Sequence, residues 1–201
     1  MGRNTIIQNL LSMNNRKLGI VSELIIQQLG KFRPIGHKHC NMIDCYNNRC
    51  EVASSIVRQK RRKKNPITED NLLDILLTYN NSYDDVCDAK SAIRGTKHFD
   101  VNINHLRIGK FDYLYYMLYF SDMVMIFRIS HADLMNEGFF SNKQTGTSTN
   151  EGQFHITEKS LHYHIDNYLI NILNYETLIA VLSKQQENRE IERETADAVH
   201  A

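Results

Sequence analysis

The spacing of apolar and polar residues predicts two helices at the start of the chain. Apolar residues recur at helical spacing through residues 4–29. Asn14 and Asn15 interrupt this stripe, and Gly30 is placed to end it. Glu23 lies inside the second of the two predicted helices.

The middle of the chain has the period that is typical of strands. Apolar and polar residues alternate within residues 98–109, which predicts one strand. Two strongly apolar runs follow at residues 111–120 and 123–129, separated by Ser121 and Asp122. They predict two neighbouring buried strands joined by a short turn.

Between these regions, residues 40–56 have the pattern of a β-hairpin. We expect one strand from Cys40 to Cys45, a turn at Asn47-Asn48 and a return strand from Arg49 to Ile56, because Asn tolerates positive φ angles. This register places Asp44 directly opposite Glu51. Two carboxylates so close repel each other unless a cation lies between them, and a divalent metal is the usual cation.

The remaining segments complete a single mixed domain over residues 1–201. The fold expected is α/β, with a central mixed sheet flanked by helices. We expect surface or capping roles for His162 and His164, at the start of the C-terminal helix. The other predicted elements are helices at 68–79, within 83–93, from Ser130 to Met135 and over 161–201 (apolar stripe to Leu182), a strand at 154–157 and a polar loop at 138–152.

Composition limits the function classes only loosely. The 201 residues are 42% hydrophobic and 23% charged, with a net charge of +1, so the overall charge does not favour nucleic acid. The basic run at residues 58–64 is a local exception, because its lysines and arginines favour contact with nucleic-acid phosphates. We find no signal peptide and no apolar run of membrane-spanning length, and we expect a cytoplasmic protein with reduced thiols and no membrane partner.

The hairpin and its neighbours resemble a known family. The segments Asn41-Met42-Ile43-Asp44 and Glu51-Val52-Ala53-Ser54-Ser55 are similar to the motif of the PD-(D/E)XK nuclease core of type II restriction endonucleases. Residues 102–107 and 111–114 are similar to the strand that follows, and the resemblance covers residues 17–130. It implies a restriction-endonuclease-like fold and Mg²⁺-dependent, sequence-specific hydrolysis of double-stranded DNA.

The resemblance also implies roles for individual residues. Asp44 and Glu51 would bind Mg²⁺ directly, and Glu23 would hold a metal-bound water. Our hairpin register favours Asp44 for the motif aspartate, whereas the usual family spacing favours Asn41. The motif lysine falls at Ala53, whose methyl group can neither orient nor deprotonate a water molecule.

Ala53 therefore leaves two related interpretations. The chain is expected to be a type II endonuclease whose present form is inactive, or a catalytically inactive DNA-binding protein on the same fold. A homodimer is expected from the endonuclease interpretation, because enzymes that cut both strands of a palindromic site share its two-fold symmetry. The expected DNA contacts are Ser54, Ser55, Arg58, Lys60, Arg61, Arg62, Asn102, Asn104, His105, Arg107, Lys143, Gln144 and Asn150.

A zinc-binding interaction module is the third interpretation of the hairpin. His37, His39, Cys40, Cys45 and Cys50 are zinc-type ligands within a short span. They lack the paired CxxC spacing that structural zinc sites use. In the predicted register Cys45 and Cys50 would be adjacent. Packing as small, buried, apolar thiols explains these two cysteines well enough without zinc.

Overall fold

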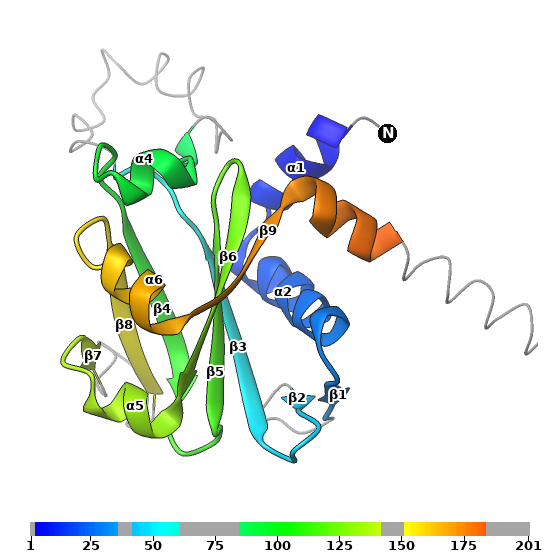
Figure 1. Ribbon diagram of the computed structural model, residues 1–201, viewed down its shortest axis with the longest axis vertical. Helices are drawn as coiled ribbons and strands as arrows, with labels where there is room; N and C mark the ends of the chain where they lie inside the picture. The colour runs from blue at the N-terminus through cyan, green and yellow to red at the C-terminus, as the bar shows by residue number, and fades with distance from the viewer. Residues whose placement is uncertain (1–2, 36–41, 61–84, 142–150, 184–201) are drawn as a thin grey trace, which may run out of the picture.

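The computed structural model describes residues 3–35, 42–60, 85–141 and 151–183. These residues form a mixed six-stranded sheet and a three-stranded sheet with flanking helices, which confirms the expected α/β class (Figure 1). The helices are α1 (Arg3–Leu11), α2 (Asn15–Leu29), α4 (Ala89–Ile93), α5 (His131–Asn136), α6 (Leu161–Tyr168) and a further helix at 175–183. The strands are β1 (Arg33–Pro34), β2 (Met42–Ile43), β3 (Arg49–Ile56), β4 (Asp100–Arg107), β5 (Tyr113–Tyr119), β6 (Met123–Ser130), β7 (Phe140–Ser141), β8 (Glu151–Thr157) and β9 (Leu169–Asn174).

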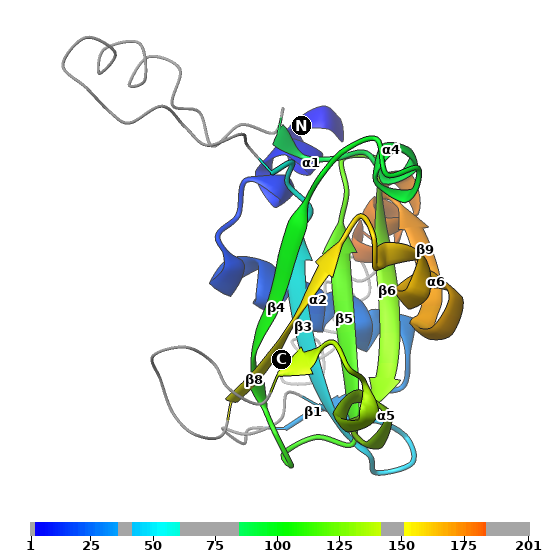
Figure 2. The same ribbon diagram turned by 90° about the vertical axis from the view of Figure 1, so that its left-hand side faces the viewer.

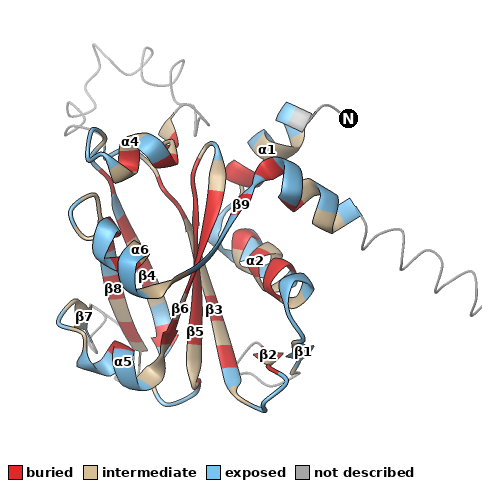
Figure 3. Cartoon of the chain, in the orientation of Figure 1, coloured by how far each residue is buried: buried red, intermediate tan, exposed pale blue. Residues whose placement is uncertain are grey.

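The six-stranded sheet has the order β1-β2-β3-β5-β6-β9. Its β3 and β5 are parallel, and its other neighbouring strands are antiparallel. β5 and β6 lie at the centre and are covered on both faces, so most of their side chains are buried (Figure 3). The two strands predicted from the apolar runs, and the turn between them, are confirmed.

Two apolar cores lie on the two faces of this sheet. On one face Tyr119 and its neighbours pack against α2, and the Tyr119 hydroxyl lies 2.9 Å from the hydroxyl of buried Ser22. On the other face Tyr116 packs against β4, β8 and α6. Along β3, Val52 belongs to the first core, whereas Ala53 packs against the second. Glu51 and Ala53 therefore share the face that is turned toward β4.

The three-stranded sheet has the order β4-β8-β7 and is antiparallel throughout. Figure 2 shows β4 and β8 in front of the six-stranded sheet. The strand predicted at 98–109 is β4, and the predicted strand at 154–157 is the end of β8. The pairing of β4 with β8 shifts between Ile103 and Leu106, where His105 has a φ of 59°. Such irregularities bend a strand and redirect its side chains.

The prediction of one continuous helix over residues 161–182 is wrong. α6 ends at Tyr168, and β9 pairs along β6 before the helix at 175–183 begins. Ile170 and Ile172 are β-branched and suit a strand, while the spacing of the neighbouring leucines fits either period. The exposed edge of β6, which the sequence alone does not reveal, favours the strand by supplying main-chain partners.

The two histidines of α6 differ in environment. His162 is exposed and its Nε2 donates to the Ile93 carbonyl oxygen, 2.9 Å away, as a surface role predicts. His164 is fully buried, and its Nδ1 lies 2.8 Å from the Tyr116 hydroxyl. The expected surface position of His164 is therefore wrong, because this side of α6 faces the core.

Other expectations are met in part. Both N-terminal helices are present, and Asn14 caps α2 by accepting a hydrogen bond from the Lys17 amide. The helix expected within 83–93 is confined to α4 in the described part of that segment, and the helix at 68–79 lies outside the described residues. No helix in the described ranges is long and apolar enough to cross a membrane.

Candidate functional site

The hairpin has a different register from the one predicted. Met42 pairs with Cys50 and Ile43 pairs with Arg49, so Asp44 follows the end of β2 and does not lie opposite Glu51. The predicted two-residue turn at Asn47-Asn48 is wrong, because residues 44–48 form the loop between the paired Ile43 and Arg49, and of the two asparagines only Asn47 has a positive φ, of 64°. The predicted adjacency of Cys45 and Cys50 is also wrong, because Cys45 is exposed in the loop and Cys50 is buried.

Asp44 stabilises this loop. Its carboxylate accepts hydrogen bonds of 2.9 Å from the Tyr46 amide, the Asn48 amide and the Asn48 side chain. Burial alone would raise the pKa of Asp44, but the hydrogen bonds from Asn48 and Tyr46 lower it below its ordinary value. An aspartate that caps a turn explains this residue without a metal.

We therefore expect Asp44→Ala to lower the free energy of unfolding by about 1–3 kcal/mol, because it leaves two main-chain amides without their charged acceptor. Asp44→Asn, which keeps an acceptor oxygen, should lose less. Urea denaturation measures both. A variant as stable as the wild type would contradict this structural role for Asp44.

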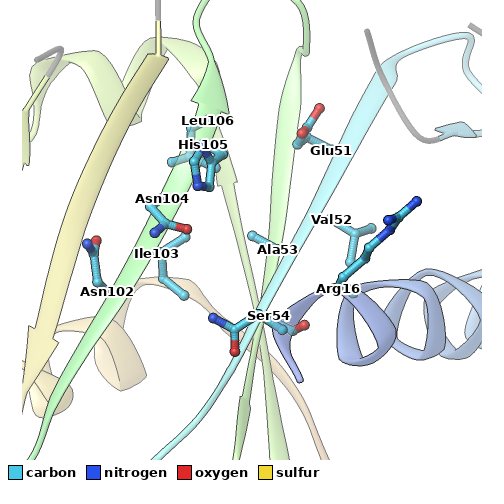
Figure 4. Close-up of a pocket in the computed structure, with 12 residues that line it drawn as sticks. Arg16, Glu51, Val52, Ala53, Ser54, Asn102, Ile103, Asn104, His105 and Leu106 are labelled. Atoms are coloured by element: carbon cyan, nitrogen blue, oxygen red, sulfur yellow. The ribbon is translucent and has the colours of Figure 1, made fainter. Parts of the chain in front are cut away.

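A polar pocket of about 400 Å³ lies between β3, β4 and the start of α2. We call it the β3–β4 pocket, and Figure 4 shows the side chains around it. Its lining residues are Asn15, Arg16 and Gly19 from α2, Glu51, Val52, Ala53 and Ser54 from β3, and Asn102, Ile103, Asn104, His105 and Leu106 from β4. Several predicted site residues from two distant segments of the sequence therefore meet at this pocket.

Buried oxygen atoms without a partner are concentrated at this pocket. Among the described residues, five buried side-chain atoms lack a hydrogen-bond partner, and three of these belong to pocket residues. They are Glu51 Oε2, Ser54 Oγ and Asn102 Oδ1. Because an unsatisfied buried oxygen is costly, these three atoms make the pocket a candidate site for water, a polar ligand or a cation.

Glu51 has a strongly perturbed environment. Burial raises the pKa of Glu51 to about 7, the nearby negative charge of Glu23 adds to this effect, and the positive charge of Arg107 opposes it. Glu23 on α2 is therefore close enough to Glu51 for their charges to interact, as the sequence-based assignment requires. A pair of carboxylates in such a setting is typical of a functional site.

Ala53 lies two residues after Glu51 and lines the same pocket. It is half-buried and packs against the core beneath β4. No lysine of the described residues lines the pocket. The position at which the resemblance would place a lysine therefore lines the pocket, and the described part of the chain puts no other lysine there.

The predicted DNA-contact residues of β4 and β3 have different environments. The Asn102 amide nitrogen donates to Gln153 Oε1 across 3.1 Å, and His105 Nδ1 lies 2.9 Å from Glu151 Oε2. Asn104 lines the pocket, whereas Arg107 and Ser55 do not. These residues lie on or beside one pocket, and their contact with DNA stays a prediction.

Two of the predicted phosphate-contact residues that follow β3 interact with other groups of the protein. Arg58 donates to the Leu11 carbonyl oxygen across 2.8 Å, and Lys60 lies 3.7 Å from Asp100. The first contact ties α1 to the end of β3 and gives Arg58 a structural role. Asn41, Arg61, Arg62, Lys143, Gln144 and Asn150 lie outside the described residues.

The zinc interpretation gains no support from the described residues. Three of its ligands, His37, His39 and Cys40, lie outside them. Within the part of the chain that is described, no three His, Cys, Asp or Glu residues are grouped closely enough to hold a metal ion. Among the described residues the β3–β4 pocket is lined by one carboxylate, Glu51, with amide and hydroxyl oxygens as the other donors, and Glu23 acts on Glu51 through its charge.

Sequence reasoning missed the contribution of α2 to the pocket. Asn15, Arg16 and Gly19 line it, yet they carry no motif and are distant from β3 in sequence. The capping pattern that begins at Asn14 was the available signal, because it fixes where the helix N-terminus lies. Which residues surround the N-terminus of α2 depends on the tertiary structure.

Comparison with known proteins gives no match to a protein-family model, a curated protein or a solved structure.

Proposed function

We propose that this protein is a Mg²⁺-dependent DNA endonuclease of the PD-(D/E)XK type, and that in its present form it binds duplex DNA without cutting it. The proposal is carried by one observation. The β3–β4 pocket places three buried oxygens without partners, which belong to Glu51, Ser54 and Asn102, around one cavity together with Ala53. The PD-(D/E)XK core itself and the identity of the nucleic acid are parts of the proposal.

The donor set of the pocket fits a hard divalent cation. Glu51 Oε2, Ser54 Oγ and Asn102 Oδ1 are oxygens without a hydrogen-bond partner, and Glu23 lies close enough to influence Glu51. Mg²⁺ prefers a few carboxylate or carbonyl oxygens together with water and phosphate oxygens. When bound, such an ion polarises a phosphoryl oxygen and makes a water molecule more acidic. Glu51 would hold it directly, with Glu23 as a partner through water.

The rest of the reaction depends on the chain itself. Hydrolysis of a phosphodiester requires a group that orients the attacking water and takes its proton. Residue 53 lies beside Glu51 on the pocket side of β3, but the alanine methyl has no donor or acceptor. Binding without efficient cleavage follows from this substitution.

DNA would approach the pocket from the β4 side. Asn104 and His105 lie at the irregular part of β4, and Arg107 follows them on the same strand. Amide, imidazole and guanidinium groups are the usual readers of base edges and phosphates. A two-fold symmetric DNA site would be met by two copies of the chain, so a homodimer is part of the proposal.

Fluorescence anisotropy with duplexes of randomised core sequence tests the proposal. The wild type should bind duplex DNA more tightly with Mg²⁺ than with EDTA and leave it intact. Glu51→Gln should lose most of the Mg²⁺ dependence, because a neutral amide is a weaker Mg²⁺ ligand than a carboxylate. Glu176→Gln, an exposed glutamate on the helix at 175–183, is the matched control. Wild-type protein with no Mg²⁺-dependent affinity for any duplex would refute the proposal.

A further inference from the structure

We propose that Arg16, at the start of α2, binds a phosphate group of the polynucleotide at the β3–β4 pocket. The inference rests on the proposed function and adds to it a substrate-binding residue from a helix that no motif identifies. It concerns binding, and it holds whether or not the chain cleaves DNA.

The first observation is the position of the Arg16 side chain. Arg16 lines the pocket together with Glu51 and Ala53, and Figure 4 shows it extending from the start of α2 beside Val52. Its guanidinium lies on the opposite side of β3 from the β4 residues (Figure 4). A phosphate group at the α2 edge of the pocket would meet the guanidinium there.

The second observation is that this guanidinium has no partner in the described part of the chain. It makes no hydrogen bond or ion pair there, although other arginines are engaged. Arg49 pairs with Asp112, Arg58 binds the Leu11 carbonyl oxygen, and Arg128 stacks on Tyr113. Arg16 is exposed, so its guanidinium is solvated and open to an anion at the edge of the pocket. Phosphate fits its planar fork well.

The third observation is the direction of the α2 dipole. α2 is a 15-residue helix that begins at Asn15, and its cap Asn14 accepts a hydrogen bond from the Lys17 amide. The amides of Asn15 and Arg16 precede the first intrahelical hydrogen bond, so they add positive potential where these residues line the pocket.

The pocket therefore presents two complementary charges to a ligand. Glu51 on β3 and Asn102 on β4 supply oxygens without partners, which suit a cation, and the α2 side supplies a guanidinium and a helix N-terminus, which suit an anion. A phosphate group chelated to a divalent cation satisfies both sides at once. A lone cation would leave Arg16 without an acceptor, and a lone phosphate would lie beside the Glu51 carboxyl.

The test compares two adjacent cations on one helix turn. Arg16→Gln should weaken duplex binding in Ca²⁺, which supports binding without turnover, by about tenfold at moderate salt. It should also reduce the slope of log affinity against log salt by about one, the effect of one lost phosphate contact. Lys17→Gln removes the same charge from an exposed residue that does not line the pocket, and should change both quantities much less. Arg16→Lys should recover part of the affinity.

The outcomes separate this inference from the function on which it rests. Thermal unfolding checks that each variant is folded. If Arg16→Gln and Lys17→Gln weaken duplex binding equally, Arg16 is not a phosphate contact, and the proposed function still stands. If the wild type shows no cation-dependent duplex binding, both are wrong.

Discussion

Ala53→Lys is expected to produce Mg²⁺-dependent cleavage of duplex DNA by a chain that does not cut it otherwise. Residue 53 lines the pocket two positions after Glu51 on the same face of β3, so a lysine there would reach the cation and the attacking water. A positioned acid–base group contributes about 10²–10⁴-fold to a hydrolytic rate. Conversion of supercoiled plasmid to nicked and linear forms, with Mg²⁺ and with EDTA, measures the gain.

Two controls identify the source of any cleavage. Ala53→Met adds a side chain of similar length without charge or proton chemistry, so it should remain inactive. Ala53→Lys combined with Glu51→Gln should also be inactive, because it lacks the proposed cation ligand. Ala53→Lys protein that is folded and binds duplex DNA with Mg²⁺, yet cuts no plasmid, would refute the endonuclease interpretation and leave only a DNA-binding protein.

The fold was most predictable where one periodicity excluded the alternatives. The runs that form β5 and β6 are short, apolar and rich in aromatic and β-branched residues, which favours buried strands, and Ser121-Asp122 marks the turn between them. Asn14 similarly separates α1 from α2 through its capping hydrogen bond. The segment that contains β9 was ambiguous, because its apolar spacing fits a helix and the pairing edge of β6 is a tertiary feature.

The candidate site was predictable residue by residue but not as an arrangement. Glu51 and Ala53 line the pocket as their shared face of one strand suggested, and Ser54, from the opposite face, lines it as well. Asp44 was misplaced because the side chain that can bind a metal can equally accept main-chain amides in a turn, and the loop length decides between these roles. Arg16 was missed because its place at the pocket results from the packing of α2 on β3.

Glu51 and His164 have opposite effects on the pH dependence of stability. Burial raises the pKa of Glu51 to about 7 and lowers the pKa of His164 to about 4. Unfolding restores the ordinary pKa values of 4.5 and 6.5. Between pH 4.5 and 7 the folded protein keeps a proton on Glu51 that the unfolded chain loses, so this group makes stability fall as pH rises. Between pH 4 and 6.5 the unfolded chain protonates His164 while the folded protein does not, so this group makes stability rise with pH.

We therefore expect these two contributions largely to cancel in the wild type between pH 4.5 and 6.5. Glu51→Gln removes the contribution of Glu51 and leaves that of His164. The free energy of unfolding of the variant should therefore rise by roughly 2–3 kcal/mol as the pH is raised from 4.5 to 6.5, at 1.36 kcal/mol per pKa unit. At pH 7.5 the variant should exceed the wild type by roughly 3 kcal/mol. Urea denaturation at a series of pH values measures both differences.

His164→Phe should give the opposite slope, with stability that falls as pH rises, whatever its absolute stability after losing the contact with Tyr116. Mg²⁺ at pH 7.5 should stabilise the wild type and not Glu51→Gln, because a ligand stabilises only the state that binds it. Parallel pH profiles for the wild type and Glu51→Gln would show that Glu51 titrates normally. The destabilising carboxyl would then no longer support a cation site, since a site that is costly when empty is the main physical reason to expect a ligand there.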